Sequence, residues 1–398
     1  MFEWKKIGIG ARDLRMLRVI LAGVVLAYAP SSLGREDDAG TRLEHVSEVV
    51  ARDAPLLMSE HGIPGLVVGV TVRGETRVFP FGLADRERGI PVTEATLFEV
   101  GSVSKTFTAT VAALAQAEGR LSLSDHPSVH WPELAGTSVD RATLAELGAY
   151  SAAGFPLQFP ANVGDEDSLL RFFREWVAPA PPGGVRVYSN PSIGLLGRLT
   201  ARALGKSFVR AVEDDLLPRL GLHETYIDVP DRAALAYAWG YDGENRRVRV
   251  SPGPLDAEAY GIKSNASDLL RYLEIQSAAE DAEGPLGEAL RTTQSGFHRV
   301  GTMTQGLGWE HYAYPTSLDT LLEGNSPALL FQPNEVEASV ASESARLFNK
   351  TGSTRGFGAY LLFVPAERVG IVVLANKNYP IPARIRLAHA VLEAVASP

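Results

Sequence analysis

Ser102 and Lys105 lie three residues apart, at the start of an apolar run from Phe107 to Ala117. On a helix, residues three apart share a face, so we expect the hydroxyl and the amine to meet. A serine hydroxyl is a weak nucleophile that needs a base beside it. A lysine becomes such a base when burial or a neighbouring cation lowers its pKa. The spacing therefore indicates an activated serine nucleophile.

A simpler interpretation of Ser-x-x-Lys is a helix N-terminus, with Ser102 as the N-cap and Lys105 in solvent. Two observations weigh against it. Only seven of the 38 basic residues are lysines, and only Lys105 completes a Ser-x-x-Lys motif. Arginine cannot give up its proton in proteins. A lysine here, in a chain that mostly uses arginine, favours the catalytic interpretation.

Composition limits the other classes of function. The 398 residues are 45% hydrophobic and 21% charged, enough for one large or two smaller cores. The net charge of −9 argues against a nucleic-acid partner. The eight histidines form no metal-binding motif, and neither a Gly-x-Ser-x-Gly motif nor a phosphate-binding loop is present. We expect an enzyme without metal or other cofactor.

The N-terminus has the pattern of a signal peptide. Basic residues precede an apolar run, Val19 to Ala29, which is short for a bilayer span. Cleavage after Ala29 or after Gly34 fits the small-residue rule, and Met16 is an alternative start. We expect residues 1–34 to be removed, giving a periplasmic, monomeric protein with no stable membrane association. An uncleaved anchor is the alternative.

Strand patterns lie at both ends of the chain, and helical patterns lie between them. The predicted strands are 65–72, 77–83, 358–364 and 369–375, and the main predicted helices are 43–60, 142–150, 166–176, 192–204, 208–217 and 383–395. We expect an α+β fold, with an antiparallel sheet built from both chain ends and flanked by helices. Residues 35–117 and 240–398 would form this α/β lobe, and 118–239 an inserted, mostly helical lobe.

Two further short motifs complete a set. Tyr188-Ser-Asn190 follows a loop rich in proline and glycine, and Lys350-Thr-Gly352 precedes the strand predicted at 358–364. With Ser102 and Lys105, in this order, they form the three-motif set of the serine β-lactamases and penicillin-binding proteins. The Tyr-x-Asn form, together with stretches such as Leu374-Ala-Asn-Lys-Asn-Tyr-Pro380, resembles the class C β-lactamases (AmpC-type cephalosporinases) over nearly the whole chain after residue 34.

The resemblance implies the two-lobed β-lactamase/DD-peptidase fold and hydrolysis of cephalosporins and penicillins through a serine acyl-enzyme, which would confer β-lactam resistance. It gives Ser102 the role of nucleophile, with Lys105 and Tyr188 sharing proton transfer and the N–H groups of Ser102 and Ser353 forming the oxyanion hole. The substrate carboxylate would be held by Lys350 and Thr351, with help from Asn378, and the acylamino side chain by Gln158 and Asn190. Gly352 and Ser353 would also bind substrate. Tyr150 and Tyr260 would line the cleft. Whether Lys105 or Tyr188 is the general base stays open.

Two residues depart from the family pattern. Arg355 stands where a small residue is usual, and Ile381 where an asparagine is usual. Arg355 replaces lost carboxylate recognition or is a solvated residue at the rim of the cleft. The functional alternatives are a D-alanyl-D-alanine peptidase or an esterase on the same fold, and a membrane-anchored penicillin-binding receptor that does not turn over.

Overall fold

The computed structural model describes residues 33–339 and 345–396. The predicted signal peptide lies outside these residues, except for Leu33 and Gly34. Among the described residues, no helix is both long and apolar enough to cross a membrane. The residues from Ala39 onward form one compact unit.

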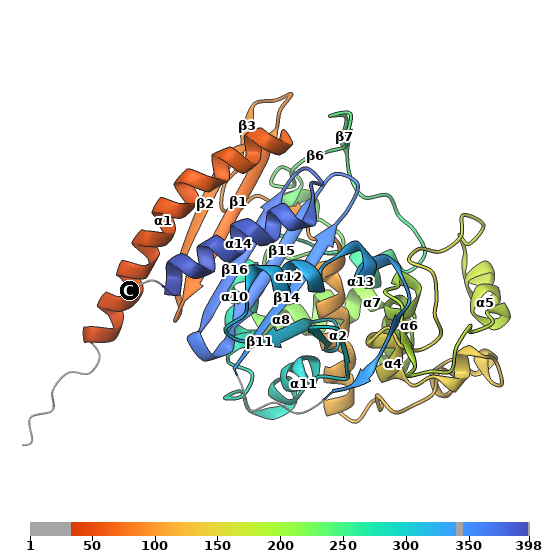
Figure 1. The fold of residues 1–398 in the computed structure, drawn as a ribbon. Coiled ribbons are helices and arrows are strands. Elements are labelled where there is room, and N and C mark those ends of the chain that lie inside the picture. The colour runs from red at the N-terminus through yellow and green to blue at the C-terminus, as the bar shows by residue number, and fades with distance from the viewer. Residues whose placement is uncertain (1–32, 340–344, 397–398) are drawn as a thin grey trace, which may run out of the picture. The chain divides into compact units, whose positions relative to one another are not determined.

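An antiparallel sheet, whose strands differ in length, contains strands from both ends of the chain (Figure 1). Within the described residues it has ten strands, in the order β13-β9-β10-β11-β14-β15-β16-β1-β2-β3. In that order the strands are Glu337–Ala338, His298–Val300, Met303–Gln305, Glu310–Ala313, Arg346–Ser353, Gly358–Val364, Val369–Ala375, Gly65–Val72, Glu75–Asp85 and Ile90–Pro91. β1 pairs with β16, with Leu66 opposite Ala375. The predicted antiparallel sheet from both chain ends is confirmed.

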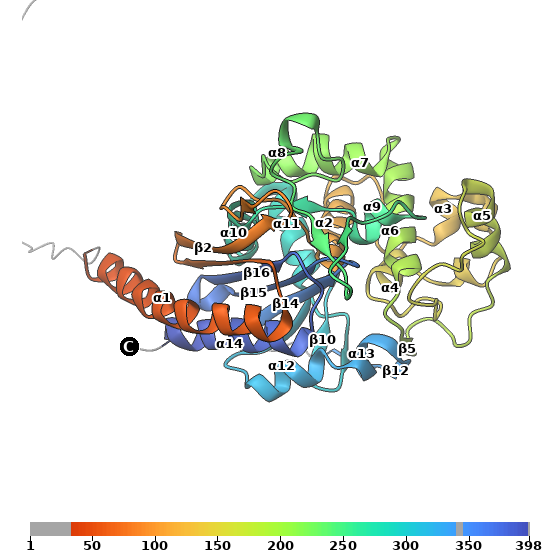
Figure 2. The ribbon, with the colours of Figure 1, turned by 90° about the horizontal axis from the view of Figure 1, so that it is seen from above.

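Helices cover both faces of this sheet, which explains why strands β1, β15 and β16 are almost wholly apolar. Every residue of β1, β15 and β16 is buried. Alternate residues of β15 enter separate cores: Leu361 and Phe363 belong to one, and Tyr360 and Leu362 to the other. Helix α1 (Leu33–His61), from Ala39 onward, and α14 (Ile381–Ala396) lie along the second face, as Figures 1 and 2 show. Helix α10 (Ala266–Ser277) packs on the first.

Helix α2 (Ser104–Ala117), whose first twelve residues are all buried, packs against α6 (Asn190–Leu204), α9 (Asp256–Tyr260) and α11 (Gly284–Gln294), while α12 (Leu318–Gly324) packs against α14. The remaining α-helices of the described residues are α3 (Pro127–His130), α4 (Leu144–Gly148), α5 (Glu166–Glu175), α7 (Phe208–Arg210), α8 (Leu217–Leu220) and α13 (Pro327–Phe331). Three short ladders join β4 (Phe98–Glu99) to β8 (Lys263–Ser264), β5 (Val185–Arg186) to β12 (Asn334–Glu335), and β6 (Gly240–Tyr241) to β7 (Arg247–Val248). The division into two lobes stays a prediction.

Candidate active site

Ser102 lies in a 3₁₀ turn, Gly101–Val103, that leads directly into α2. Lys105 follows in the first turn of the helix, and its Nζ donates a hydrogen bond to Ser102 Oγ at 2.9 Å. The same Nζ donates to the carbonyl oxygen of Ala259 on α9 at 2.7 Å, so α9 helps to orient the amine. The predicted pairing of hydroxyl and amine is therefore present in the structure.

The surroundings of Lys105 favour its neutral form. The side chain is fully buried. Burial lowers the pKa of Lys105 to about 8, and the positive charge of Lys350 acts in the same direction, while Tyr188 opposes it. An amine with such a pKa can accept a proton near neutral pH. Lys105 thus has the two properties that a base for Ser102 requires, contact and a lowered pKa.

Tyr188 lies between the two buried lysines, just before α6. The helix begins here because the Ser189 side chain accepts a hydrogen bond from Ser192 N and Pro191 occupies the first turn. The Nζ atoms of Lys105 and Lys350 lie 5.2 and 4.9 Å from the centre of the Tyr188 ring. Burial alone raises the pKa of Tyr188, but the positive charges of both lysines and the Ser102 hydroxyl outweigh it, so the pKa lies below its usual value.

Lys350 differs from Lys105 in having a carboxylate beside it. Its Nζ lies 3.4 Å from Glu310 Oε1, and both side chains are buried. Burial disfavours the ammonium, yet Glu310 and then Tyr188 raise the pKa of Lys350 above its usual value. Arg186 approaches the same carboxylate oxygen at 3.5 Å and is held by Gln305 Oε1 at 2.8 Å. One buried carboxylate therefore lies between two buried cations.

The end of β14 closes against the turn that carries Ser102. A Cβ on Gly352 would lie 1.9 Å from Val100 O and 3.1 Å from Ser102 N, and a Cβ on Gly101 would lie 2.5 Å from Ser353 N. Gly101 also has a φ of +53°, which favours glycine. Glycine at both positions allows the two segments to approach closely. The backbone N–H groups of Ser102 and Ser353 belong to these adjoining segments.

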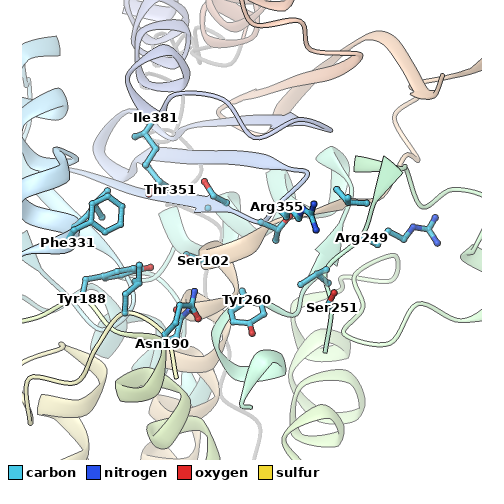
Figure 3. Close-up of a pocket in the computed structure, with 18 residues that line it drawn as sticks. Ser102, Tyr188, Asn190, Arg249, Ser251, Tyr260, Phe331, Thr351, Arg355 and Ile381 are labelled. Carbon is cyan, nitrogen blue, oxygen red and sulfur yellow. The ribbon is translucent and has the colours of Figure 1, made fainter. Parts of the chain in front are cut away.

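A cavity of about 660 Å³ opens over Ser102 (Figure 3). Among the residues with predicted roles, those that line it are Ser102, Gln158, Tyr188, Asn190, Tyr260, Thr351, Gly352, Ser353, Arg355 and Ile381. Gln158 and Asn190 contact each other, with Asn190 Nδ2 donating to Gln158 Oε1 at 2.9 Å. The volume is in the range of small-molecule sites.

Lys105, Lys350 and Asn378 have predicted roles but do not line the cavity, and of the three Asn378 is exposed. Lys105 and Lys350 are buried beneath the cavity, and the Oδ1 of Asn378 accepts a hydrogen bond from Arg384 Nη2 at 2.7 Å. The expectation that Tyr150 lines the cleft is wrong: Tyr150 is buried against Tyr188, with ring centres 4.8 Å apart. Of this pair of rings, it is Tyr188 that lines the cavity.

Three buried charged residues that support the site were not identified from the sequence. Glu310 and Arg186 set the charge around Lys350, and Arg384 donates to Gly352 O at 2.6 Å and to Ser353 Oγ at 3.0 Å, which supports the end of β14. The available signal was a charged residue among apolar and aromatic neighbours, as in Trp309-Glu-His-Tyr312. Across the described residues, no group of three or more acidic or histidine side chains is placed to hold a metal ion.

A cavity-lining serine bonded to a buried lysine of lowered pKa, beside a tyrosine between two lysines, is the arrangement of a serine acyl-transfer enzyme. The sequence matches the Beta-lactamase family over residues 45–396. The chain belongs to this family.

Individual relatives agree with this assignment. The chain is 46% identical to a beta-lactamase of Pseudomonas fluorescens over 353 residues, 88% of this chain and 99% of the relative. A solved Beta-Lactamase/D-Alanine Carboxypeptidase from Pseudomonas syringae superposes with a TM-score of 0.86 at 42% identity, covering 89% of this chain and 99% of that one. A class C beta-lactamase in complex with cefoxitin gives a TM-score of 0.84 at 40% identity, covering 90% and 99%. The predicted resemblance to class C β-lactamases is confirmed.

Proposed function

We propose that this protein hydrolyses the β-lactam amide of cephalosporins and penicillins through an acyl-enzyme on Ser102, and so confers β-lactam resistance. The observation that carries the proposal is the 2.9 Å contact between Lys105 Nζ and Ser102 Oγ at the base of a cavity lined by Tyr188. The structural relative bound to cefoxitin, a β-lactam, supports this substrate class.

In the acylation step, Ser102 Oγ attacks the lactam carbonyl carbon and its proton passes into the group formed by Lys105 and Tyr188. The N–H groups of Ser102 and Ser353 donate to the oxyanion of the tetrahedral intermediate. The C–N bond then breaks, and the ring nitrogen receives the proton from the same group. In deacylation, a water loses its proton to this group and attacks the ester carbonyl carbon. The bond between that carbon and Ser102 Oγ then breaks, and Oγ receives the proton from the same group.

Lys105 and Tyr188 act as one coupled proton acceptor in this proposal. Each is buried, each has a lowered pKa, and each influences the other's charge. Protons shared between such groups belong to the pair and not to one residue. The open question of which residue is the base therefore becomes a question about the whole group, including Lys350.

The substrate would lie along the end of β14. Thr351 and Gly352 would face its carboxylate, while the buried ammonium of Lys350 supplies positive charge from below and Asn378 would help to hold it. The paired amides of Gln158 and Asn190 would bind the acylamino group, together with Ser353. Residues 35–117 and 240–398 would form one lobe and 118–239 the other, with this cavity between them. We also propose export to the periplasm after removal of residues 1–34, and a monomeric mature protein.

The test uses the purified mature protein with a cephalosporin, following ring opening by absorbance and adduct formation by intact mass. We expect rapid turnover, loss of both turnover and adduct in Ser102→Ala, and a decrease in kcat of about 10²–10⁴-fold in Tyr188→Phe. A stable one-to-one adduct without turnover would instead indicate a penicillin-binding receptor. If neither turnover nor an adduct were detected, β-lactams would be excluded as substrates.

The second candidate is a D-alanine carboxypeptidase, because the solved relative from Pseudomonas syringae is a Beta-Lactamase/D-Alanine Carboxypeptidase. Both reactions acylate a serine and differ in the acyl donor. Release of D-alanine from a peptide that ends in D-alanyl-D-alanine, lost in Ser102→Ala, would establish it. The ratio of kcat/KM for this peptide and for a cephalosporin decides which activity dominates.

A further inference from the structure

Arg355 lines the cavity at a definite place relative to the reacting atoms. It follows Thr351, Gly352 and Ser353 along the same segment, two residues beyond the N–H group of Ser353. Figure 3 shows Ile381 and Phe331 on one side of Ser102, and Arg355 with Ser251 on the other. A substrate that lies along this segment therefore meets Thr351 at one end and Arg355 at the other.

The chemistry of β-lactams decides which end of the substrate reaches Arg355. The carboxylate and the acylamino side chain are attached on opposite sides of the lactam carbonyl. With the carboxylate at Thr351 and the carbonyl oxygen at Ser353, the acylamino side chain points to Arg355. Two residues of chain span at most about 7 Å, and about five bonds of roughly 1.5 Å separate the lactam carbonyl from a substituent on the first side-chain carbon. The two lengths match.

The structure fixes the segment that carries Arg355. Buried Glu99 accepts a hydrogen bond from Thr354 Oγ1 at 2.5 Å with one carboxylate oxygen and from Val250 N at 2.7 Å with the other. Arg355 Nη2 donates to Asp242 Oδ2 at 3.0 Å, an oxygen that also accepts from Arg246. Among the described residues, Asp242 is the one side-chain hydrogen-bond partner of the Arg355 guanidinium. Since a guanidinium has five N–H donors, others stay available to a ligand.

A second cation stands behind Arg355 in the same wall. The guanidinium of Arg249 stacks on Tyr237 and Trp239, with its central carbon 3.8 and 4.3 Å from the ring centres. In Figure 3 its guanidinium points away from Ser102, so Arg249 contributes charge to the wall and Arg355 contributes the donors.

We propose that Arg355 makes this enzyme selective for β-lactams whose acylamino side chain carries an anionic group, held by the guanidinium that Asp242 orients. This rests on the proposed function and names its substrate class. It differs from the hypothesis made on the sequence, which assigned Arg355 to the ring carboxylate. Planar guanidinium and carboxylate groups pair through two parallel hydrogen bonds, which gives such a contact both strength and direction.

The experiment compares two penicillins that differ by a single carboxylate: one with a phenylacetyl side chain, and the same molecule with a carboxylate on the side-chain carbon next to the amide carbonyl. The measured quantity is the ratio of their kcat/KM values. We expect Arg355→Gln to lower the ratio for the carboxylated compound by about 3- to 10-fold, because Arg355 is 64% exposed and solvent weakens the contact. Arg355→Lys should retain part of the preference, since it keeps the charge.

The matched control is Arg210→Gln, which removes an arginine that is 72% exposed and pairs with Asp214. It should leave the ratio unchanged. A ratio that Arg355→Gln does not change, or that both variants change equally, would overturn the inference while leaving hydrolysis established. Absence of turnover and of any Ser102 adduct with both penicillins would overturn the proposed function itself, and the inference with it.

Discussion

The two lysines of the site have the same side chain but different surroundings. Lys105 Nζ contacts a hydroxyl and a carbonyl oxygen, whereas Lys350 Nζ lies beside the carboxylate of Glu310. Burial lowers the pKa of the first to about 8, and Glu310 raises the pKa of the second. Near neutral pH, one lysine can therefore accept a proton while the other remains an ammonium. Tyr188 lies between them and is subject to both charges.

Glu310→Gln tests this division of charge. The Glu310 carboxylate raises the pKa values of Lys105, Lys350 and Tyr188, so its removal lowers all three. We expect the rising limb of kcat/KM against pH to move to lower pH, measured from pH 5 to 9. Because the variant leaves Arg186 and Lys350 without their buried partner, we also expect a loss of about 3–5 kcal/mol in the free energy of unfolding.

The control for this variant is Glu337→Gln, which removes a carboxylate that is 62% exposed and pairs with Arg299 at the edge of the sheet. It should change neither the pH profile nor, by more than about 1 kcal/mol, the stability. A pH profile of Glu310→Gln that coincides with that of the parent protein would show that Glu310 does not control proton transfer.

At the scale of elements, the site depends on how closely the end of β14 approaches the turn before α2. We expect Gly352→Ala to push these segments apart, because the new Cβ would lie 1.9 Å from Val100 O. The displaced Ser353 N–H would no longer meet the oxyanion, and the acylation rate should fall by about 10²–10³-fold. Stopped-flow absorbance with a cephalosporin measures this rate.

Gly164→Ala is the matched control, since a Cβ at Gly164 meets no atom within 4 Å. It should acylate at the parent rate. If Gly352→Ala acylated as fast as this control, the close approach of the two segments would have no part in catalysis.

The elements also show what the sequence could predict. The strands over 65–72, 358–364 and 369–375 were found with the predicted bounds, because each is a continuous apolar run buried on both faces. Lys350-Thr-Gly352 was expected before a strand, but it lies within β14. This strand was not predicted because the polar residues at its active-site end interrupt the apolar pattern. The short strands β9 to β11 gave no signal, because each has only three or four residues.

The same reasoning explains the outcome for the site. Ser102, Lys105, Tyr188 and Asn190 lie in short motifs whose spacing is visible in the sequence, and the structure brings them together. Glu310 meets Lys350 only because β11 pairs with β14, with Glu310 opposite Asn349. A contact that depends on strand register between distant segments leaves no local pattern.

At the scale of the whole molecule, the packing of helices beneath the cavity has a cost in stability. Glu258 lies on α9, next to Ala259 and Tyr260 of the site, and is 5% exposed. It faces Gly197 of α6, where an added Cβ would lie 2.6 Å from Glu258 Cγ. Burial raises the pKa of Glu258 to about 7, against an ordinary value of 4.5. The folded protein therefore holds this proton more tightly than the unfolded chain does.

The sign of the effect on stability follows from linkage. Below pH 4.5 the carboxyl is protonated in both states; as the pH rises from 4.5 through about 7, the unfolded chain loses the proton more readily and the folded state loses stability. Glutamine has no proton to lose, so Glu258→Gln should be more stable than the parent at pH 8 by about 1–3 kcal/mol. The difference should decrease steadily towards pH 4.5.

Urea unfolding at pH 5, 6.5 and 8 measures this difference, with Glu280→Gln as the control, because Glu280 is 72% exposed. The control should show no difference that changes with pH. A constant difference for Glu258→Gln would mean that the side chain ionises as freely in the fold as in the unfolded chain. A gain in the free energy of unfolding that is confined to high pH would show that the buried Glu258 carboxyl destabilises the fold there. Glu258 is next to Ala259, whose carbonyl orients Lys105. The destabilisation would therefore occur in the segment that supports the site, at the pH where Lys105 can act as a base.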